Sequence, residues 1–319
     1  MKALVTGGCG FIGFEVCKKL IEIGYEVVVV DDLSTGSKDN KLSNIKYFHN
    51  SIHDTRCPPY YMSDYDYDYD VIFHLAAIPR VSYSVEQTLT TTQANVISTV
   101  RLLDCLRNKK NGKDTKFIYS SSSSIYGGAD QLPTPEEIPA DPMSLYAMQK
   151  WQGEEWCRVY SKIYGLNTVC LRYFNVFGPG SKYGGAYSTV LSAWLYYLYK
   201  DKSIVPYLEG DGTQTRDFCY IDNVVQANIL AAESDQIFQG DAFNISHGSL
   251  ISLSDCQTLL EKISGEKLPL EMRPPRVGDV KHTLANIDKA RQVLGYDPDT
   301  DLESQMRKTA DWYKNEYKV

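Results

Sequence analysis

The chain has 319 residues, of which 43% are hydrophobic and 23% charged, a composition that excludes a disordered or fibrous protein. Its formal net charge of -7 disfavours a nucleic-acid partner, because binding to phosphates normally requires an excess of basic residues. The first residues lack the features of a signal peptide, and the most apolar later stretch, 194–199, is far shorter than the roughly 20 residues that span a bilayer. We therefore expect one large domain or two smaller ones, with no membrane span.

The N-terminal segment predicts a dinucleotide-binding turn. A short apolar strand, 2–6, runs into the sequence G-G-C-G-F-I-G at 7–13, and apolar residues spaced three or four apart then predict a helix. Glycines in such a loop let the turn tighten, let the backbone approach a pyrophosphate and let the helix pack on its strand, while the helix N-terminus attracts the anion. The loop residues expected at a dinucleotide are Gly7, Gly10, Phe11, Ile12 and Gly13.

The next strand ends in two acidic residues. The β-branched run 26–30 predicts a buried parallel strand, and Asp31 and Asp32 follow it, about 20 positions after the glycine loop. A carboxylate at this place can accept hydrogen bonds from an adenosine ribose and would repel a 2'-phosphate. We therefore predict NAD, and not NADP, as the cofactor.

Strands and helices go on alternating along the first half of the chain. Strands are expected at 45–48, 71–75, 116–119 and 167–174, and helices at 88–107 and about 146–163. Ile52 and Asp54 could flank an adenine or belong to a plain surface turn. The small side chains around Leu75, Ala76 and Ala77 would let the backbone pass close to the cofactor.

This alternation predicts a Rossmann-type α/β fold with a doubly wound parallel sheet. After residue 179 the alternation lapses into two strands, expected at 217–221 and 242–245, and four helices, expected at 188–200, 252–263, 287–294 and 302–313. We assign 1–175, with about 214–245, to an NAD-binding domain. A smaller C-terminal substrate-binding domain then takes about 176–213 and 246–319.

The stretch 119–150 combines hydroxyl groups with a tyrosine–lysine pair. It contains Y-S-S-S-S-S-I-Y-G from 119 and Y-A-M-Q-K from 146. Residues four apart share a helix face, so the Lys150 ammonium group could lie beside Tyr146 and lower the pKa of its phenol. A surface helix and a serine linker would give the same pattern. Because strand carboxyl ends bind ligands in such sheets, we favour an acid/base site, with serine hydroxyls near the reacting oxygen.

Other residue patterns are weaker. Arg216 and Arg276 could clamp phosphates, since guanidinium groups suit phosphate oxygens, or could form surface ion pairs. Eight scattered cysteines favour free thiols in a reducing cytoplasm. His49, His53 and Cys57 recur at every fourth position, but no other ligands converge on them, so we expect no bound metal.

Seven motifs together resemble the extended short-chain dehydrogenase/reductases, and among these the nucleotide-sugar 4-epimerases. They are T-G-G-C-G-F-I-G at 6–13, H-L-A-A at 74–77, S-S-S-S-I-Y-G at 121–127, Y-A-M-Q-K at 146–150, L-R-Y-F-N-V-F-G-P at 171–179, R-D-F-C-Y-I-D-N at 216–223 and R-V-G-D at 276–279. The match covers essentially the whole length. Leu145 replaces a usual proline and Ser98 a common glycine, and neither change touches a catalytic group.

The resemblance implies an NAD-dependent isomerase that inverts C4 of a UDP-hexose through a transient 4-keto sugar. Tyr146 would be the acid/base, Lys150 the group that lowers its pKa and holds the nicotinamide ribose, and Ser122 the hydroxyl beside the reacting oxygen. Asn95, which interrupts an apolar helix stripe and could simply bridge loops, would lie near the cofactor with Tyr173. The implied substrate contacts are Ser122, Ser123, Ser124, Tyr146, Asn175, Ala186, Tyr187, Val190, Tyr207, Arg216, Arg276, Asp279 and Thr283.

The resemblance also bears on the substrate. Related dehydratases carry an Asp-Glu pair where this chain has serines, which favours epimerisation. Thr283 stands where a bulky residue would exclude an acetamido group, which favours UDP-GlcNAc/UDP-GalNAc, with UDP-Glc/UDP-Gal as a second pair. The alternatives are a UDP-glucuronate 4-epimerase or decarboxylase and, from another class, a non-catalytic NAD-binding scaffold protein. Family members usually form dimers through the helices that begin near Thr88 and Tyr146, so we expect a homodimer.

Overall fold

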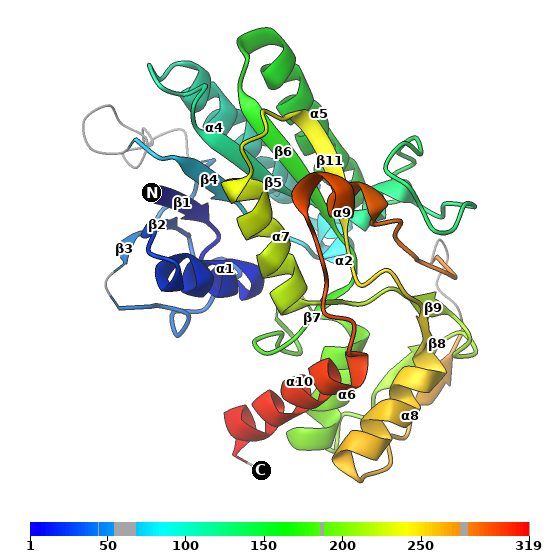
Figure 1. Ribbon diagram of the computed structural model, residues 1–319. Coiled ribbons are helices and arrows are strands. Elements are labelled where there is room, and N and C mark those ends of the chain that lie inside the picture. The colour runs from blue at the N-terminus through cyan, green and yellow to red at the C-terminus, as the bar shows by residue number, and fades with distance from the viewer. Residues whose placement is uncertain (44, 54–67, 186–187, 275–279, 319) are drawn as a thin grey trace.

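The computed structural model describes all residues except 44, 54–67, 186–187, 275–279 and 319. Its centre is a seven-stranded parallel sheet in the order β11-β6-β5-β4-β1-β2-β3 (Figure 1). The strands are β1 (Lys2–Thr6), β2 (Glu26–Val30), β3 (Lys46–Phe48), β4 (Val71–His74), β5 (Lys116–Ser122), β6 (Asn167–Tyr173) and β11 (Gln239–Ile245). The chain starts in the middle and winds outward to both sides, which confirms the predicted doubly wound fold.

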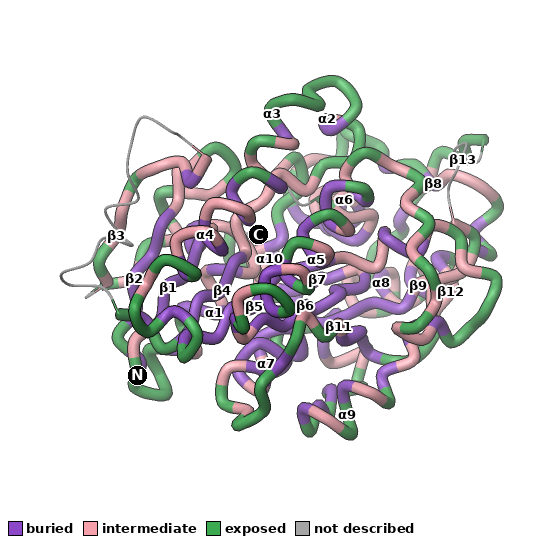
Figure 2. Tube along the Cα trace, turned by 90° about the horizontal axis from the view of Figure 1, so that it is seen from above, coloured by how far each residue is buried: buried purple, intermediate pink, exposed green. Residues whose placement is uncertain are grey.

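Alternate side chains of the strands enter two separate apolar layers. On one face Val5 and Val29 pack with α1 (Phe11–Glu22) and α7 (Ile221–Glu233). On the other face Leu4 and Val28 pack with α4 (Ser98–Arg107) and α5 (Leu145–Tyr164). The sheet is therefore buried on both sides, as Figure 2 shows, and this explains its continuous β-branched runs.

The segment predicted as one helix at 88–107 is interrupted. It consists of α3 (Thr88–Thr92), a π-helical turn (Gln93–Ile97) and α4, and a short helix that was not predicted, α2 (Val81–Glu86), precedes it. Asn95 lies in the π-helical turn, and its side chain bonds to groups outside the helix. π-helical turns are rare and occur often at functional sites.

A whole helix was also missed after the strand predicted at 217–221. That strand is only β10 (Cys219–Tyr220), and Ile221 begins α7, a helix of 13 residues. The helical signal is present in the sequence, because Ile221, Val224 and Val225 have helical spacing and Asp222 suits a first turn. The serine run was likewise predicted to follow its strand, but β5 continues through Ser122, so the first serines belong to the sheet.

Three of the remaining helices gather at one end of the molecule (Figure 1). α6 (Val190–Tyr199), α8 (Leu253–Ser264) and α10 (Leu302–Tyr317) pack together there, and α9 (Asp288–Leu294) packs on β11. Three two-stranded sheets pair β7 (Val176–Phe177) with β10, β9 (Thr215–Arg216) with β12 (Ile251–Ser252), and β8 (Tyr207–Glu209) with β13 (Glu271–Arg273). The division into two domains stays a prediction.

Seven cysteines lie in the described part of the chain and are all free thiols. No helix in that part is long and apolar enough to cross a membrane. His49 and His53 are described, Cys57 is not, and the described residues form no group of three or more His, Cys, Asp or Glu side chains that could hold a metal ion.

Candidate active site

A cleft of about 340 Å³ lies across the carboxyl ends of the central strands. It brings together segments that are far apart in the sequence, from the glycine loop to the first turns of α5. The predicted site residues that line it are Gly7, Gly10, Phe11, Ile12, Gly13, Asp31, Asp32, Ile52, Leu75, Ala76, Ala77, Ser122, Tyr146, Lys150 and Tyr173. A cleft at this edge of a doubly wound sheet is the usual ligand site of the fold.

The glycine loop leaves no room for side chains at two positions. Gly7 has a φ of +73°, and a Cβ there would lie 2.7 Å from the backbone nitrogen of Ala76. A Cβ on Gly13 would lie 2.1 Å from the carbonyl oxygen of Gly7. The loop therefore brings bare backbone to the cleft at the start of α1, and a helix N-terminus attracts a phosphate group.

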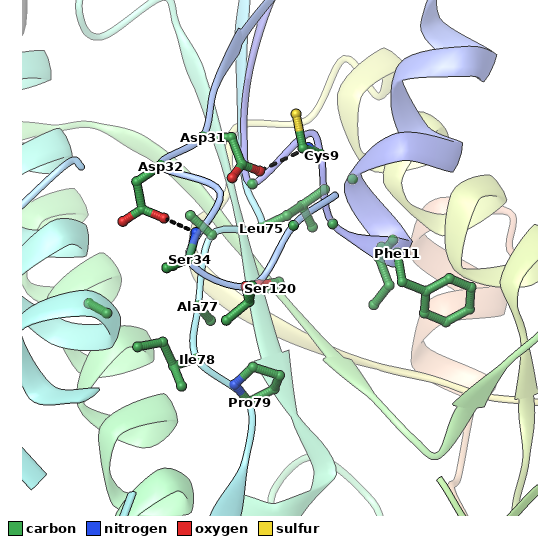
Figure 3. Close-up of a pocket in the computed structure, with 18 of the residues that line it drawn as sticks. Cys9, Phe11, Asp31, Asp32, Ser34, Leu75, Ala77, Ile78, Pro79 and Ser120 are labelled. Atoms are coloured by element: carbon green, nitrogen blue, oxygen red, sulfur yellow. Dashed lines mark hydrogen bonds between the residues drawn. The ribbon is translucent and has the colours of Figure 1, made fainter. Parts of the chain in front are cut away.

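The acidic residue after β2 is fixed in place. Asp31 Oδ2 accepts a hydrogen bond from the backbone N–H of Cys9 (2.9 Å), and Oδ1 accepts one from Leu33 (2.8 Å); Figure 3 shows the first. Burial raises the pKa of Asp31, and these two bonds act against that rise. Carboxylate oxygens have further lone pairs for ribose hydroxyls, so the loop and Asp31 together fit a dinucleotide.

Tyr146, Lys150 and Ser122 meet in the same cleft. Lys150 is buried; its Nζ donates to the carbonyl oxygen of Ser120 (2.6 Å) and lies 6.0 Å from the centre of the Tyr146 ring. The hydroxyl of Ser122 accepts a hydrogen bond from the hydroxyl of Ser124 (2.9 Å). A hydroxyl has one proton, so that of Ser122 remains available for Tyr146 or a substrate oxygen.

The pKa values in this group differ from the prediction. The sequence predicted a lowered pKa for Tyr146, but burial raises the pKa of its phenol to about 12, and only the hydrogen bond with Ser122 opposes the rise. Burial also lowers the pKa of Lys150 to about 7, against the charge of Glu154. The physical reason is desolvation, which disfavours the charged form of both groups.

Thr283 stands at a second, much smaller cavity of about 20 Å³, which Ser123 and Phe174 also line. Its hydroxyl accepts hydrogen bonds from Asn175 Nδ2 (3.2 Å) and from the backbone N–H of Asp217 (3.4 Å). Asn175 has the rare φ of +27° and also donates to the carbonyl oxygen of Asp217 (3.1 Å). The structure thus joins three segments that the sequence keeps far apart.

Several predicted site residues do not line the cleft. Asn95 lies behind it, Arg216 donates to the backbone carbonyls of Thr215 and Lys281, and Tyr207 stacks with Arg273, whose guanidinium carbon is 3.9 Å from the ring centre. Other residues lie away from it or outside the described residues. Val190 lies away from it, and Ser124 does not line it but bonds to Ser122, which does. The residues outside the described part of the chain are Asp54, Ala186, Tyr187, Arg276 and Asp279.

The cleft also contains residues that were not predicted. They follow β2 and β3, extend the segment after β4, belong to the π-helical turn, α4 or β5, or come from the loop after β7. The chief ones are Ser34, Thr35, Gly36, Ser37, Asn40, Asn50, Ser51, Ile78, Pro79, Ala94, Ser98, Ser120, Ser121, Gly180, Lys182 and Gly185. Many are small or polar residues directly after a strand, and this position was the available signal.

The parallel sheet, the glycine loop and the acidic residue after β2 define an α/β enzyme that binds a dinucleotide. A family model agrees over residues 3–246, and the chain belongs to the NAD dependent epimerase/dehydratase family. The predicted family, enzyme class and NAD cofactor are thereby confirmed. The roles predicted for individual residues stay predictions.

Individual relatives match along the whole chain. A UDP-glucose 4-epimerase of Mycolicibacterium smegmatis is 31% identical, with 99% of both chains covered. The solved structure of a UDP-N-acetylglucosamine 4-epimerase from Methanobrevibacter ruminantium, in complex with UDP-N-acetylmuramic acid, has a TM-score of 0.89 and 32% identity, covering 99% of this chain and 98% of that one. A UDP-glucuronic acid 4-epimerase from Bacillus cereus, with UDP-glucuronic acid and NAD, has a TM-score of 0.88 and 32% identity, covering 99% and 100%.

Proposed function

We propose that this protein is an NAD-dependent 4-epimerase of UDP-hexoses. The observation that carries the proposal is that Tyr146, Ser122 and Lys150 share one cleft with the glycine loop and Asp31. Tyr146 would thus act as an acid/base group beside the dinucleotide. The similarity to UDP-sugar 4-epimerases over the whole chain supports the choice of substrate class.

The residues present suit a bound dinucleotide. The glycine loop and the N-terminus of α1 would hold its pyrophosphate, Asp31 its adenosine ribose, and Lys150 the second ribose. Bound NAD would supply a cationic ring that accepts a hydride from C4 of the sugar and returns it. Tyr146 would remove the proton from the 4-hydroxyl and later give it back, while Ser122 donates a hydrogen bond to the same oxygen.

This role requires Tyr146 to lose its proton more easily than its raised pKa of about 12 allows. A charged Lys150 favours the phenolate, and so does donation from the Ser122 hydroxyl. For epimerisation, the 4-keto sugar must then present its other face. A cleft that grips the nucleotide and leaves the hexose loosely held would permit that rotation.

Replacing Tyr146 with Phe tests the role of the phenol. We expect turnover to fall by about 10²- to 10⁴-fold, because a positioned acid/base contributes a factor of this size, and NAD binding to persist. Turnover is followed with UDP-sugars and NAD binding by calorimetry. Tyr164→Phe, near the end of the same helix and outside the residues that line the cleft, is the matched control. Unchanged turnover in Tyr146→Phe would refute the acid/base role of the phenol.

Among UDP-hexoses, we propose UDP-GlcNAc/UDP-GalNAc as the main pair, with UDP-Glc/UDP-Gal as the second. The threonine at 283 and the small cavity beside it support this choice, because a short side chain leaves room for an acetamido group. A UDP-glucuronate 4-epimerase is the alternative. A sugar carboxylate would need a cation nearby, and the lining residue Lys182 supplies one if its ammonium group leaves its ion pair with Glu316.

We also propose that the protein is a homodimer. Apolar side chains are exposed along α2, α3, the π-helical turn and α5, elements that pack side by side. They are Val85, Leu89, Ile97, Met148 and Trp156. A second copy of the same surface would cover them, as expected for two-fold dimers.

The oligomeric state tests this surface directly. Met148→Glu would place a charge in the interface, so we expect the mass in solution, measured by light scattering, to fall from dimer to monomer. Ile237→Glu changes an exposed apolar residue near β11 and should leave the dimer intact. A monomeric unaltered protein at micromolar concentration would contradict the proposal.

A further inference from the structure

His74 is a buried histidine that the proposed chemistry does not use. It ends β4, has 1% of its surface exposed, and directly precedes the segment 75–79 that lines the cleft. Its imidazole lies between two threonines. Nδ1 is 2.8 Å from the hydroxyl of Thr6 on β1, and Nε2 is 2.9 Å from the hydroxyl of Thr99 on α4.

The neighbouring hydrogen bonds decide which nitrogen carries the proton. The Thr99 hydroxyl donates to the carbonyl oxygen of Asn95 (3.0 Å), so towards His74 it can only accept. Nε2 must therefore carry the proton and donate to Thr99. In a neutral imidazole Nδ1 is then an acceptor, so it accepts a hydrogen bond from the Thr6 hydroxyl. The Thr6 oxygen in turn accepts one from the backbone N–H of Ala76 (3.2 Å). All these bonds point in one direction.

The ring stays neutral because of its surroundings. In the described part of the chain, the charged or titratable groups that act on it are Lys150, whose charge disfavours a second cation, and Tyr119, whose ring centre is 5.9 Å away. The other contact is the apolar ring of Phe117 at 5.7 Å. Burial, with the charge of Lys150, lowers the pKa of His74 to about 3.

The hydrogen bonds that run from Ala76 through His74 to Asn95 lead back to the cleft, because the side chain of Asn95 bonds to Ile78. Asn95 Oδ1 accepts from the backbone N–H of Ile78 (2.8 Å), and Nδ2 donates to the carbonyl oxygen of Ile78 (3.1 Å) and to Oε1 of Gln149 (2.7 Å). Gln149 lies on α5 next to Lys150, and Ile78 lines the cleft. One buried hydrogen-bond network thus holds the cleft segment at Ala76 and at Ile78 and attaches it to the catalytic helix.

We propose that His74 is a positioning residue. As a neutral imidazole protonated at Nε2, it orients Thr6 and Thr99 so that the segment 75–79 keeps a fixed place between the dinucleotide site and α5. The effect on turnover rests on the proposed function; the tautomer and the effect on NAD binding do not.

Nitrogen-15 NMR of the unaltered protein tests the tautomer. The chain has five histidines, and comparison with His74→Gln identifies the signals of this one. We expect Nδ1 to resonate as an unprotonated nitrogen and Nε2 as a protonated one, with no change between about pH 8 and pH 5, where an ordinary histidine titrates. Protonation at Nδ1, or titration in that range, would overturn the proposal.

Thr99→Val tests the positioning role by removing one hydroxyl with little change of shape. We expect NAD to bind about tenfold more weakly, since one buried donor loses its acceptor. Thr90→Val, at an exposed position on α3, is the control and should bind NAD as the unaltered protein does. A Thr99→Val protein that melts at a lower temperature but binds NAD with unchanged affinity would show a structural role only, and would refute positioning.

Discussion

Lys150 illustrates how a single residue of the site lowers the stability of the fold. Its ammonium group is buried, and its pKa is lowered to about 7 in the folded protein from an ordinary value of 10.5. Between these two values the unfolded chain binds more protons than the folded one. The free energy of unfolding must therefore rise with pH across this window, by up to about 1.4 kcal/mol per pH unit from this group.

Lys150→Met should remove this loss of stability. At pH 7 the variant is expected to be more stable than the unaltered protein, by several kcal/mol at most. It should also lose the rise in stability between about pH 7 and pH 10.5. Its turnover should fall, because the phenolate of Tyr146 loses its cation. Denaturant unfolding at several pH values measures this. Lys162→Met, exposed on the same helix, should keep the original pH dependence, and an identical dependence in Lys150→Met would refute the argument.

Among the helices and strands, α5 and β5 approach so closely that one position requires glycine. A Cβ on Gly153 of α5 would lie 2.1 Å from the hydroxyl oxygen of Tyr119 on β5. Alanine normally stabilises a helix interior by about 1 kcal/mol over glycine. Here the overlap with a buried ring, which costs typically 1–3 kcal/mol, should outweigh that gain.

We therefore expect Gly153→Ala to lower the free energy of unfolding, and with it the activity, because the ring of Tyr119 is also 5.1 Å from Lys150 Nζ. Thermal or denaturant unfolding measures the change. Gly128→Ala is the control, since nothing lies within 4 Å of a Cβ at that position. A stabilised Gly153→Ala protein would mean that β5 and α5 can separate freely.

An element can be predicted from the sequence when the interactions that form it lie within a few residues of one another. The glycine loop could be predicted because its reasons lie within a few residues. The π-helical turn could not, because its central residue Asn95 bonds to Ile78 and Gln149, which are 17 and 54 residues away. α7 was missed although its periodicity is local, because the strand predicted at 217–221 included Ile221, the first residue of the helix.

The same reason limits the prediction of the site. Tyr146 and Lys150 are neighbours on one helix, and their meeting in the cleft could be predicted from their spacing. The direction of their pKa shifts could not, since it depends on burial by the whole sheet. The small lining residues after β4, Ala76 and Ala77, were predicted, whereas those after β2, such as Ser34 and Ser37, were not.

For the whole molecule, the choice of sugar that we propose would depend on segments that only the complete fold brings together. Thr283 precedes α9, Asn175 follows β6 and Asp217 precedes β10, yet their polar groups are bonded to one another. We therefore expect a substitution at Thr283 to change substrate preference without changing the dinucleotide site, which other residues line.

Thr283→Tyr tests this separation. A bulky ring would fill the space beside Ser123, so we expect turnover of UDP-GlcNAc to fall at least tenfold more than turnover of UDP-Glc, a loss of about 1.4 kcal/mol in discrimination. NAD affinity should stay the same. Thr283→Ser keeps the hydroxyl and serves as the control. An equal loss on both sugars would mean that the residue supports the fold and does not select the acetamido group.

The most direct test of the central claim is to incubate the purified protein separately with UDP-GlcNAc, UDP-Glc and UDP-glucuronate, without added cofactor, and to follow the products by proton NMR. Our account predicts conversion of UDP-GlcNAc to UDP-GalNAc, with hydride returned to the sugar by retained NAD. Conversion of UDP-Glc or UDP-glucuronate alone would keep the chemistry and refute the assignment of the sugar. No conversion of any of the three, even after NAD is added, would contradict 4-epimerisation.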